Sequence, residues 1–141
     1  MIEMKYNIPI KEKMVCASST LSISSLNAVK VCKALNRKKF ADVKTILDNV
    51  LNGKATLNGR YYTKTVEEIS KFLKQLEANT KIKNINPDTM TLFISAHMGP
   101  KIYRSRRRRQ HGMQLKICHI QAVLSEENVN RKEVRERGNK K

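Results

Sequence analysis

The chain has 141 residues, and its 29 Lys and Arg residues against 12 Asp and Glu residues give a formal net charge of +17 at pH 7. Leu, Ile, Val and Phe together make up 35 residues, which excludes a wholly disordered chain and allows one domain with a core. The charge disfavours an ordinary soluble enzyme and predicts an anionic partner, with nucleic acid the first candidate and an anionic membrane surface the second.

The first third of the chain predicts a strand followed by a helix. Residues 13–19 are typical of a short strand. Ser24 or Ser25 can cap a helix that ends near Leu35. The apolar residues that recur at spacings of three and four, and that we expect on the buried face, are Ala28, Val29, Cys32 and Leu35.

Two more helices are predicted before residue 90. One begins near Phe40 and stops at Gly53, and its apolar face carries Phe40, Val43, Leu47, Val50 and Leu51. The next begins with a capping box, in which the Thr65 hydroxyl and the Glu68 carboxylate each bond an orphan backbone N–H. Its apolar positions are Val66, Ile69, Leu73 and Leu76, and Asn86-Pro87-Asp88 then forms a turn.

From Met90 the hydrophobic period changes to two, which predicts two strands. In the first, Met90, Leu92, Ile94, Ala96 and Met98 share one face. The second runs from about Leu115 to Leu124, and its alternation changes phase near Cys118, which indicates a bulge there or a ribbon that leaves the sheet at that point. The pattern predicts an α+β fold of three helices packed on a small antiparallel sheet, with a long basic β-hairpin over residues 98–118.

The positive charge is concentrated in two stretches. Residues 30–64 contain nine basic and two acidic residues, and residues 89–125 contain seven basic residues and no acid, so the two stretches carry +14 of the +17. Residues 126–141 mix six basic with four acidic residues and have few apolar ones. We therefore expect a single domain over residues 1–125 and a charged C-terminal tail over residues 126–141.

The tip of the predicted hairpin carries the most specific chemistry. Residues 101–112 read Lys-Ile-Tyr-Arg-Ser-Arg-Arg-Arg-Arg-Gln-His-Gly. Four consecutive arginines repel one another in water, whereas phosphates neutralise them, and a guanidinium fork binds phosphate oxygens bidentately. A solvated charge run or a nuclear-import signal is the alternative, and the lack of any acid over 37 residues weighs against it.

The aromatic content and the absence of known DNA-binding motifs narrow the kind of nucleic acid that we expect this chain to bind. The chain has no Trp, four Tyr and three Phe, so the strands do not offer an aromatic platform for stacking single-stranded bases. No zinc-finger or basic-zipper pattern is present. The remaining hypothesis is that the chain recognises the shape and the backbone charge of a folded RNA.

The His, Cys and Asp residues that could suggest a catalytic or metal site do not have the spacing that such a site requires. His97, Cys118 and His119 fit no zinc-ligand spacing, and no carboxylate lies near enough in sequence to orient a Cys–His pair. Asp42 and Asp48 are six residues apart and do not share a helix face. We expect no catalytic residues, no metal and no cofactor.

The chain resembles the universal large-subunit ribosomal protein twenty-two family, whose eukaryotic branch is called large protein seventeen. The resemblance covers residues 22–124, and the segments that carry it are Leu73–Asn79, Met98–Lys101, the arginine-rich tip, His111–Gly112, Cys118–Ile120 and Val123–Glu126. It implies three helices against a three-stranded antiparallel sheet. It also implies a protein that binds large-subunit ribosomal RNA near the polypeptide exit, with a hairpin that lines the exit tunnel.

The chain departs from the family in three places. Ser24-Ser25-Leu26-Asn27 stands where bacterial members have Ser-Pro-Arg-Lys. The connector Asn52–Lys64 is short, and we expect its basic residues Lys54, Arg60 and Lys64 to retain part of the contacts of the family's longer connector. The segment Met113–Ile117 is also short. We therefore expect the hairpin to reach less far into the tunnel.

The sequence thus predicts a cytoplasmic, non-catalytic component of the large ribosomal subunit, with ribosomal RNA, neighbouring ribosomal proteins and the nascent polypeptide as partners. A DNA-binding architectural protein is the main alternative, and a nucleic-acid enzyme is a third hypothesis.

The cysteines indicate a reducing compartment, because their number is odd and no Cys-x-x-Cys pair is present; they are Cys16, Cys32 and Cys118. No membrane partner is expected, since no apolar run approaches ~20 residues and the N-terminus shows no signal or transit pattern.

The candidate RNA-binding residues are Lys30, Lys33, Arg37, Lys38, Lys39, Arg60, Lys101, Tyr103, Arg104, Arg106, Arg107, Arg108, Arg109, His111 and Lys116.

Overall fold

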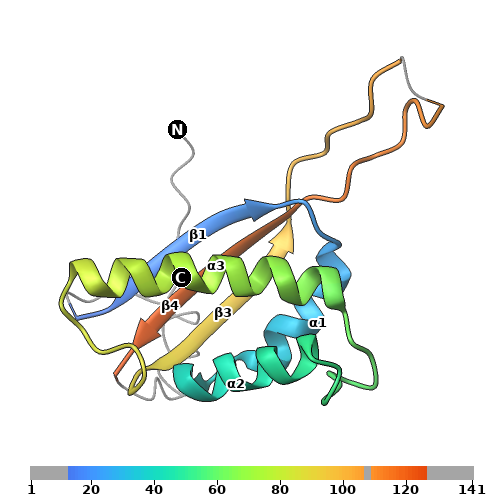
Figure 1. Cartoon of the computed structure of the whole chain (residues 1–141). Coiled ribbons are helices and arrows are strands. Elements are labelled where there is room, and N and C mark those ends of the chain that lie inside the picture. The colour runs from blue at the N-terminus through green and yellow to red at the C-terminus, as the bar shows by residue number, and fades with distance from the viewer. Residues whose placement is uncertain (1–12, 107–108, 127–141) are drawn as a thin grey trace, which may run out of the picture.

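The computed structural model describes residues 13–106 and 109–126, and within them the chain forms an α+β fold (Figure 1). The helices and strands follow one another as β1 (Val15–Leu21), α1 (Ser25–Leu35), β2 (Lys38–Lys39), α2 (Phe40–Leu51), α3 (Thr63–Ile82), β3 (Thr91–Met98) and β4 (Cys118–Ser125). The predicted tail over residues 126–141 falls, apart from Glu126, outside the described residues.

The sheet is antiparallel and has four strands in the order β1-β4-β3-β2. The prediction of three strands was wrong, because the two-residue strand β2 pairs with the start of β3. Arg37, with φ of 65°, reverses the chain after α1, and its N–H donates to the Leu92 oxygen at 2.8 Å. Two lysines suit such an edge, since their charge discourages pairing with another chain.

One face of the sheet is covered by helices and holds the main core. Helices α1 and α3 pack on the strands, and α2 packs against α3 beside them (Figure 1). The predicted two-residue period is confirmed for Met90, Leu92 and Ile94, which are all buried in this core, whereas Met98 is 64% exposed where β3 leaves the helices. The even-numbered residues of β4, from Cys118 to Leu124, face the same core.

The predicted helix faces need two corrections. In α1 the buried valine is Val31, and Val29 is only partly buried. In α2, Phe40, Val43, Leu47 and Val50 are buried as predicted, but Leu51 is 38% exposed at the last turn. Both errors lie at the margin of an apolar stripe, where one step of 100° decides whether a side chain faces the core.

The capping box predicted for α3 is absent. The helix begins two residues earlier, at Thr63, after Tyr62 in the left-handed conformation, and no side chain caps it. Thr65 is therefore already inside the first turn, where it is buried. The Glu68 carboxylate instead accepts a hydrogen bond from Lys71 Nζ at 2.8 Å.

The β-ladder of the hairpin is much shorter than predicted. Regular pairing of β3 with β4 ends at Met98 and Cys118, and beyond it the described backbone shows one isolated bridge, between Tyr103 and Gln114. The two arms still run side by side away from the body of the domain (Figure 1). The hairpin is thus a projecting antiparallel loop rather than a continuous β-ribbon.

A register offset separates the sheet from the projecting arms. Gly99 N–H donates to the Ile117 oxygen at 3.0 Å, and the next pair is Tyr103 with Gln114, so one arm has three residues where the other has two. The offset includes Pro100, which has no N–H to donate. The pairing of β4 itself is continuous. The predicted bulge near Cys118 is therefore absent there, and the alternative that the ribbon leaves the sheet at this point is confirmed.

Gly99 is required by the close approach of the two arms. A Cβ at this position would lie 2.7 Å from Ile117 Cγ2 and 3.0 Å from the Ile117 carbonyl carbon. We predict that Gly99→Ala lowers the free energy of unfolding by about 1–3 kcal/mol, the cost typical of overpacking, as measured by chemical denaturation. In an Ile117→Ala background the same substitution should cost less, and an equal cost in both backgrounds would contradict this explanation.

The buried thiols couple stability to alkaline pH. Burial, and secondarily the nearby Cys118 thiol, raises the pKa of Cys32 to about 12. Burial also raises the pKa of Cys118, although its hydrogen bond to the His97 oxygen acts in the opposite direction. A folded-state pKa above the unfolded value stabilises the protein below the unfolded pKa, and this contribution is lost as the pH rises.

We predict that the free energy of unfolding falls between about pH 8.5, the pKa of a free thiol, and pH 12, by at most about 1.4 kcal/mol per pH unit for each thiol. Cys32→Ala should make the pH dependence shallower in denaturant titrations. Val31→Ala is the matched control, since it also truncates the α1 core face but keeps the thiol. Identical slopes for both variants would refute the linkage.

Candidate nucleic-acid interface

The first group of predicted cations lies at the free edge of the sheet. Lys38 and Lys39 form β2 and pair with Leu92 and Thr91, which are the first residues of β3. Their side chains and that of Arg37 are exposed. The edge strand thus presents three adjacent cations to the solvent, at the end of β3 opposite to the hairpin.

Lys30 and Lys33 are exposed on α1, and Arg60 is exposed in the connector between α2 and α3. Helix α1 starts beside the hairpin base and ends at β2, so its two lysines lie between the other groups of cations. Arg60 closes a tight turn in which its backbone exchanges hydrogen bonds with that of Leu57, at 2.9 and 3.0 Å.

The hairpin carries the densest group of candidate residues. Lys101, Tyr103, Arg106, Arg109, His111 and Lys116 are exposed, and Arg104 is half-buried. Arg107 and Arg108 lie outside the described residues. None of the ion pairs found in the described part of the chain involves a hairpin cation.

The candidate residues therefore form two separate groups joined by a helix. Thr91, which pairs with Lys39, and Met98, where the hairpin leaves the sheet, are the two ends of β3. The seven residue-to-residue steps between these ends, at about 3.3 Å each, separate them by roughly 23 Å. The structure brings the hairpin base together with the start of α1, but it does not bring the β2 cations to the hairpin.

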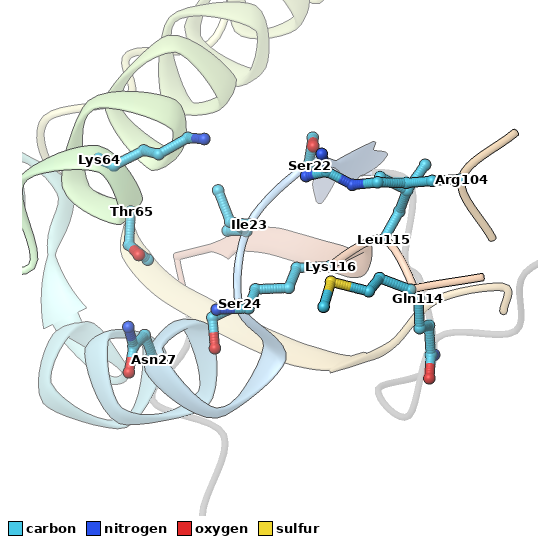
Figure 2. Close-up of a pocket in the computed structure, with 11 residues that line it drawn as sticks. Ser22, Ile23, Ser24, Asn27, Lys64, Thr65, Arg104, Gln114, Leu115 and Lys116 are labelled. Carbon is cyan, nitrogen blue, oxygen red and sulfur yellow. The ribbon is translucent and has the colours of Figure 1, made fainter. Parts of the chain in front are cut away.

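A cavity of about 470 Å³ lies where the hairpin base meets the first turns of α1 and α3, and we call it the basal cavity (Figure 2). Its lining includes three cations, Lys64, Arg104 and Lys116, and contains no acidic residue. Figure 2 shows Lys64 and Arg104 extending from opposite sides toward the Ser22 backbone region. The cavity is completed by Ser22, Ile23, Ser24, Asn27, Thr65, Met113, Gln114 and Leu115.

The sequence alone did not identify the whole of this cavity. Arg104 and Lys116 are candidate RNA-binding residues, and the resemblance implies for Lys64 only a part of the contacts of the connector. Thr65 was interpreted as a helix cap, a role that the structure excludes. No signal in the sequence marks this cavity. The first turn of α3 is free of acids only because the helix begins at Thr63, whereas the sequence predicts a start whose first turn includes Glu68.

The residues first considered for metal binding or nucleophilic chemistry are separated by the sheet. Cys118 is fully buried in the main core and donates to the His97 backbone oxygen at 3.2 Å. His119 points to the other face, where its Nδ1 lies 2.7 Å from Thr20 Oγ1 and its ring 5.9 Å from that of His97. Within residues 13–106 and 109–126, no group of three or more His, Cys, Asp or Glu side chains could hold a metal ion.

Two further findings concern membrane spans and known protein families. Among the helices that the structure describes, none combines the length and the apolar character needed to cross a bilayer. No protein-family model matches the chain.

Proposed function

We propose that this chain is a structural, non-catalytic component of the large ribosomal subunit, of the universal large-subunit protein twenty-two type. In this role the domain binds ribosomal RNA through backbone phosphates, and the hairpin passes between RNA segments to line the polypeptide exit tunnel. Its partners are then large-subunit RNA, neighbouring large-subunit proteins and the passing nascent chain, and it works in the cytoplasm.

The observation that carries this proposal is the projection of an acid-free cationic hairpin from a well-packed domain. The arms leave the sheet after Met98 and expose Ile102, Tyr103 and Met113 by 47–59% together with their cations. Exposed apolar and cationic side chains on one protruding loop are costly in water. Packing among nucleotides satisfies both, since phosphates neutralise the cations and bases and sugars cover the apolar groups.

The cations of α1 and β2 extend this surface along the domain. Arg37, Lys38 and Lys39 at one end and the hairpin base at the other are separated by the length of β3. A surface of this length suits a partner that carries a phosphate at regular intervals, and a large folded RNA is such a partner. The arrangement supports recognition by shape and charge.

We predict that the protein sediments with large ribosomal subunits and stays bound through moderate-salt washes. The measurement is quantitative immunodetection across a sucrose gradient of cell extract, with and without nuclease treatment. A signal confined to the free-protein fractions of the intact extract would contradict the proposal. Affinity for duplex DNA equal to or above that for folded large-subunit RNA, measured at one salt concentration, would favour the DNA-binding alternative instead.

Replacing hairpin arginines should weaken RNA binding without unfolding the domain. For Arg106→Gln with Arg109→Gln, we predict that the slope of log affinity against log salt decreases in magnitude by about 1.4 to 1.8, if each arginine meets one phosphate. The melting temperature should change little, because both side chains are exposed. The readout is a filter-binding series with a large-subunit RNA fragment at several salt concentrations.

The matched control is Lys74→Gln with Lys81→Gln, which removes the same charge from exposed positions of α3. This control should keep a slope close to that of the unchanged chain. Equal slopes for the hairpin variant and the control would show that net charge, rather than the hairpin, determines binding. A large loss of melting temperature in the hairpin variant would instead show that the arginines are structural.

A further inference from the structure

We propose that the basal cavity holds one unstacked nucleotide of the bound RNA, with its phosphate between Lys64, Lys116 and the first turns of α1 and α3. The proposal rests on the RNA-binding function above and adds to it a defined pocket for a single nucleotide. Phosphate contacts elsewhere on the chain need only a charged surface, whereas this site is a cavity with converging polar groups (Figure 2).

The first argument is the unbalanced positive charge of the cavity. Lys64 lies in the first turn of α3, and Lys116 and Arg104 come from the hairpin base. No ion pair of the described residues involves any of the three. A cation near a helix N-terminus is itself unfavourable, since that end of the helix carries a partial positive charge. An anion in the cavity would relieve both repulsions.

The second argument is that two helix N-termini open onto the same cavity without a cap. Ser24, the residue before α1, and Thr65 of α3 both line the cavity, and neither helix has a side-chain cap or an acid in its first turn. The N–H groups of a first turn have no acceptor inside the helix. Backbone N–H groups in this position are well suited to phosphate oxygens.

The third argument is the Thr65 hydroxyl, which points independently to a ligand. Thr65 is only 5% exposed and lines the cavity. Among the residues that the structure describes, no hydrogen-bond partner is found for its side chain. Within the described residues no side-chain nitrogen or oxygen is both fully buried and unpaired, so this hydroxyl is open to the cavity. A polar ligand atom in the cavity can replace the water that the hydroxyl meets there.

The size and the apolar part of the lining favour a nucleotide over a phosphate ion alone. A volume of about 470 Å³ falls in the range of pockets that hold small organic ligands. Ile23 and Leu115 give the cavity an apolar wall beside the cations. Arg104 offers a guanidinium plane on which an unpaired base can stack, which is a common mode of RNA recognition.

The site can be tested with a mononucleotide on the full chain. Adenosine monophosphate should shift the backbone amide NMR signals of Ser24, Asn27 and Thr65 in a saturable manner, and inorganic phosphate at the same concentration should bind at least about tenfold more weakly. Lys64→Gln with Lys116→Gln should abolish the shifts, whereas Lys74→Gln with Lys81→Gln should retain them. Equal affinity for inorganic phosphate would overturn the nucleotide assignment, and so would the absence of localised shifts.

Thr65→Val provides a second test that separates binding from stability. The substitution keeps the side-chain volume and removes a hydroxyl for which no hydrogen bond is found among the described residues, so the melting temperature should change little. Affinity for adenosine monophosphate should fall by roughly tenfold, as expected for losing one hydrogen bond to a charged group. An unchanged affinity would remove Thr65 from the site and overturn the geometry proposed here.

The failure of this inference can be told apart from the failure of the proposed function. If the pocket variants lose nucleotide binding but the chain also fails to bind large-subunit RNA, the ribosomal proposal fails. If RNA binding and its salt slope are intact while mononucleotide binding is absent from the unchanged chain, only the pocket is refuted. The two measurements use the same protein preparations, so one set of variants decides both.

Discussion

The mutual repulsion of closely placed cations that lack acidic neighbours is the constraint on which the functional interpretation depends. Within the domain, Lys44 shows the ordinary solution, since it pairs with Glu77 at 3.2 Å and lies over the Phe40 ring. The described cations of the hairpin and its base have no such ion pair. Uncompensated charge of this kind is the basis on which we propose an anionic partner.

The domain serves as a rigid support for this charge. Residues of the three strands β1, β3 and β4 and of all three helices form one core, so the end of the sheet from which the hairpin leaves is firmly held. The close approach of Gly99 to Ile117 joins the two arms at this point. The arms beyond have few backbone hydrogen bonds, so their conformation can adapt to a partner more easily than the sheet can.

The two proposals divide the surface between general and specific contacts. In the proposed function, exposed cations on β2, α1 and the hairpin would provide affinity that depends on salt and carries no sequence information. The basal cavity has a defined volume and converging polar groups, among them Thr65, and in the further proposal it would fix the register of the protein on its partner. Both kinds of contact meet at the hairpin base, where Arg104 and Lys116 line the cavity.

The sequence by itself determined the α+β class, the three helices, the β3 core face and the exposed cationic hairpin, because each follows from a local period or from charges too many to bury. Prediction from the sequence failed for features that depend on contacts between residues far apart in the chain. The fourth strand needed β3 as a partner for Lys38 and Lys39, and the start of α3 depended on the backbone turn at Tyr62 rather than on a Thr–Glu pair. Only the tertiary structure decided that Thr65 and Lys116, 51 positions apart in the chain, line one cavity, because packing of two helix ends against the hairpin base has no periodic signature in a single sequence.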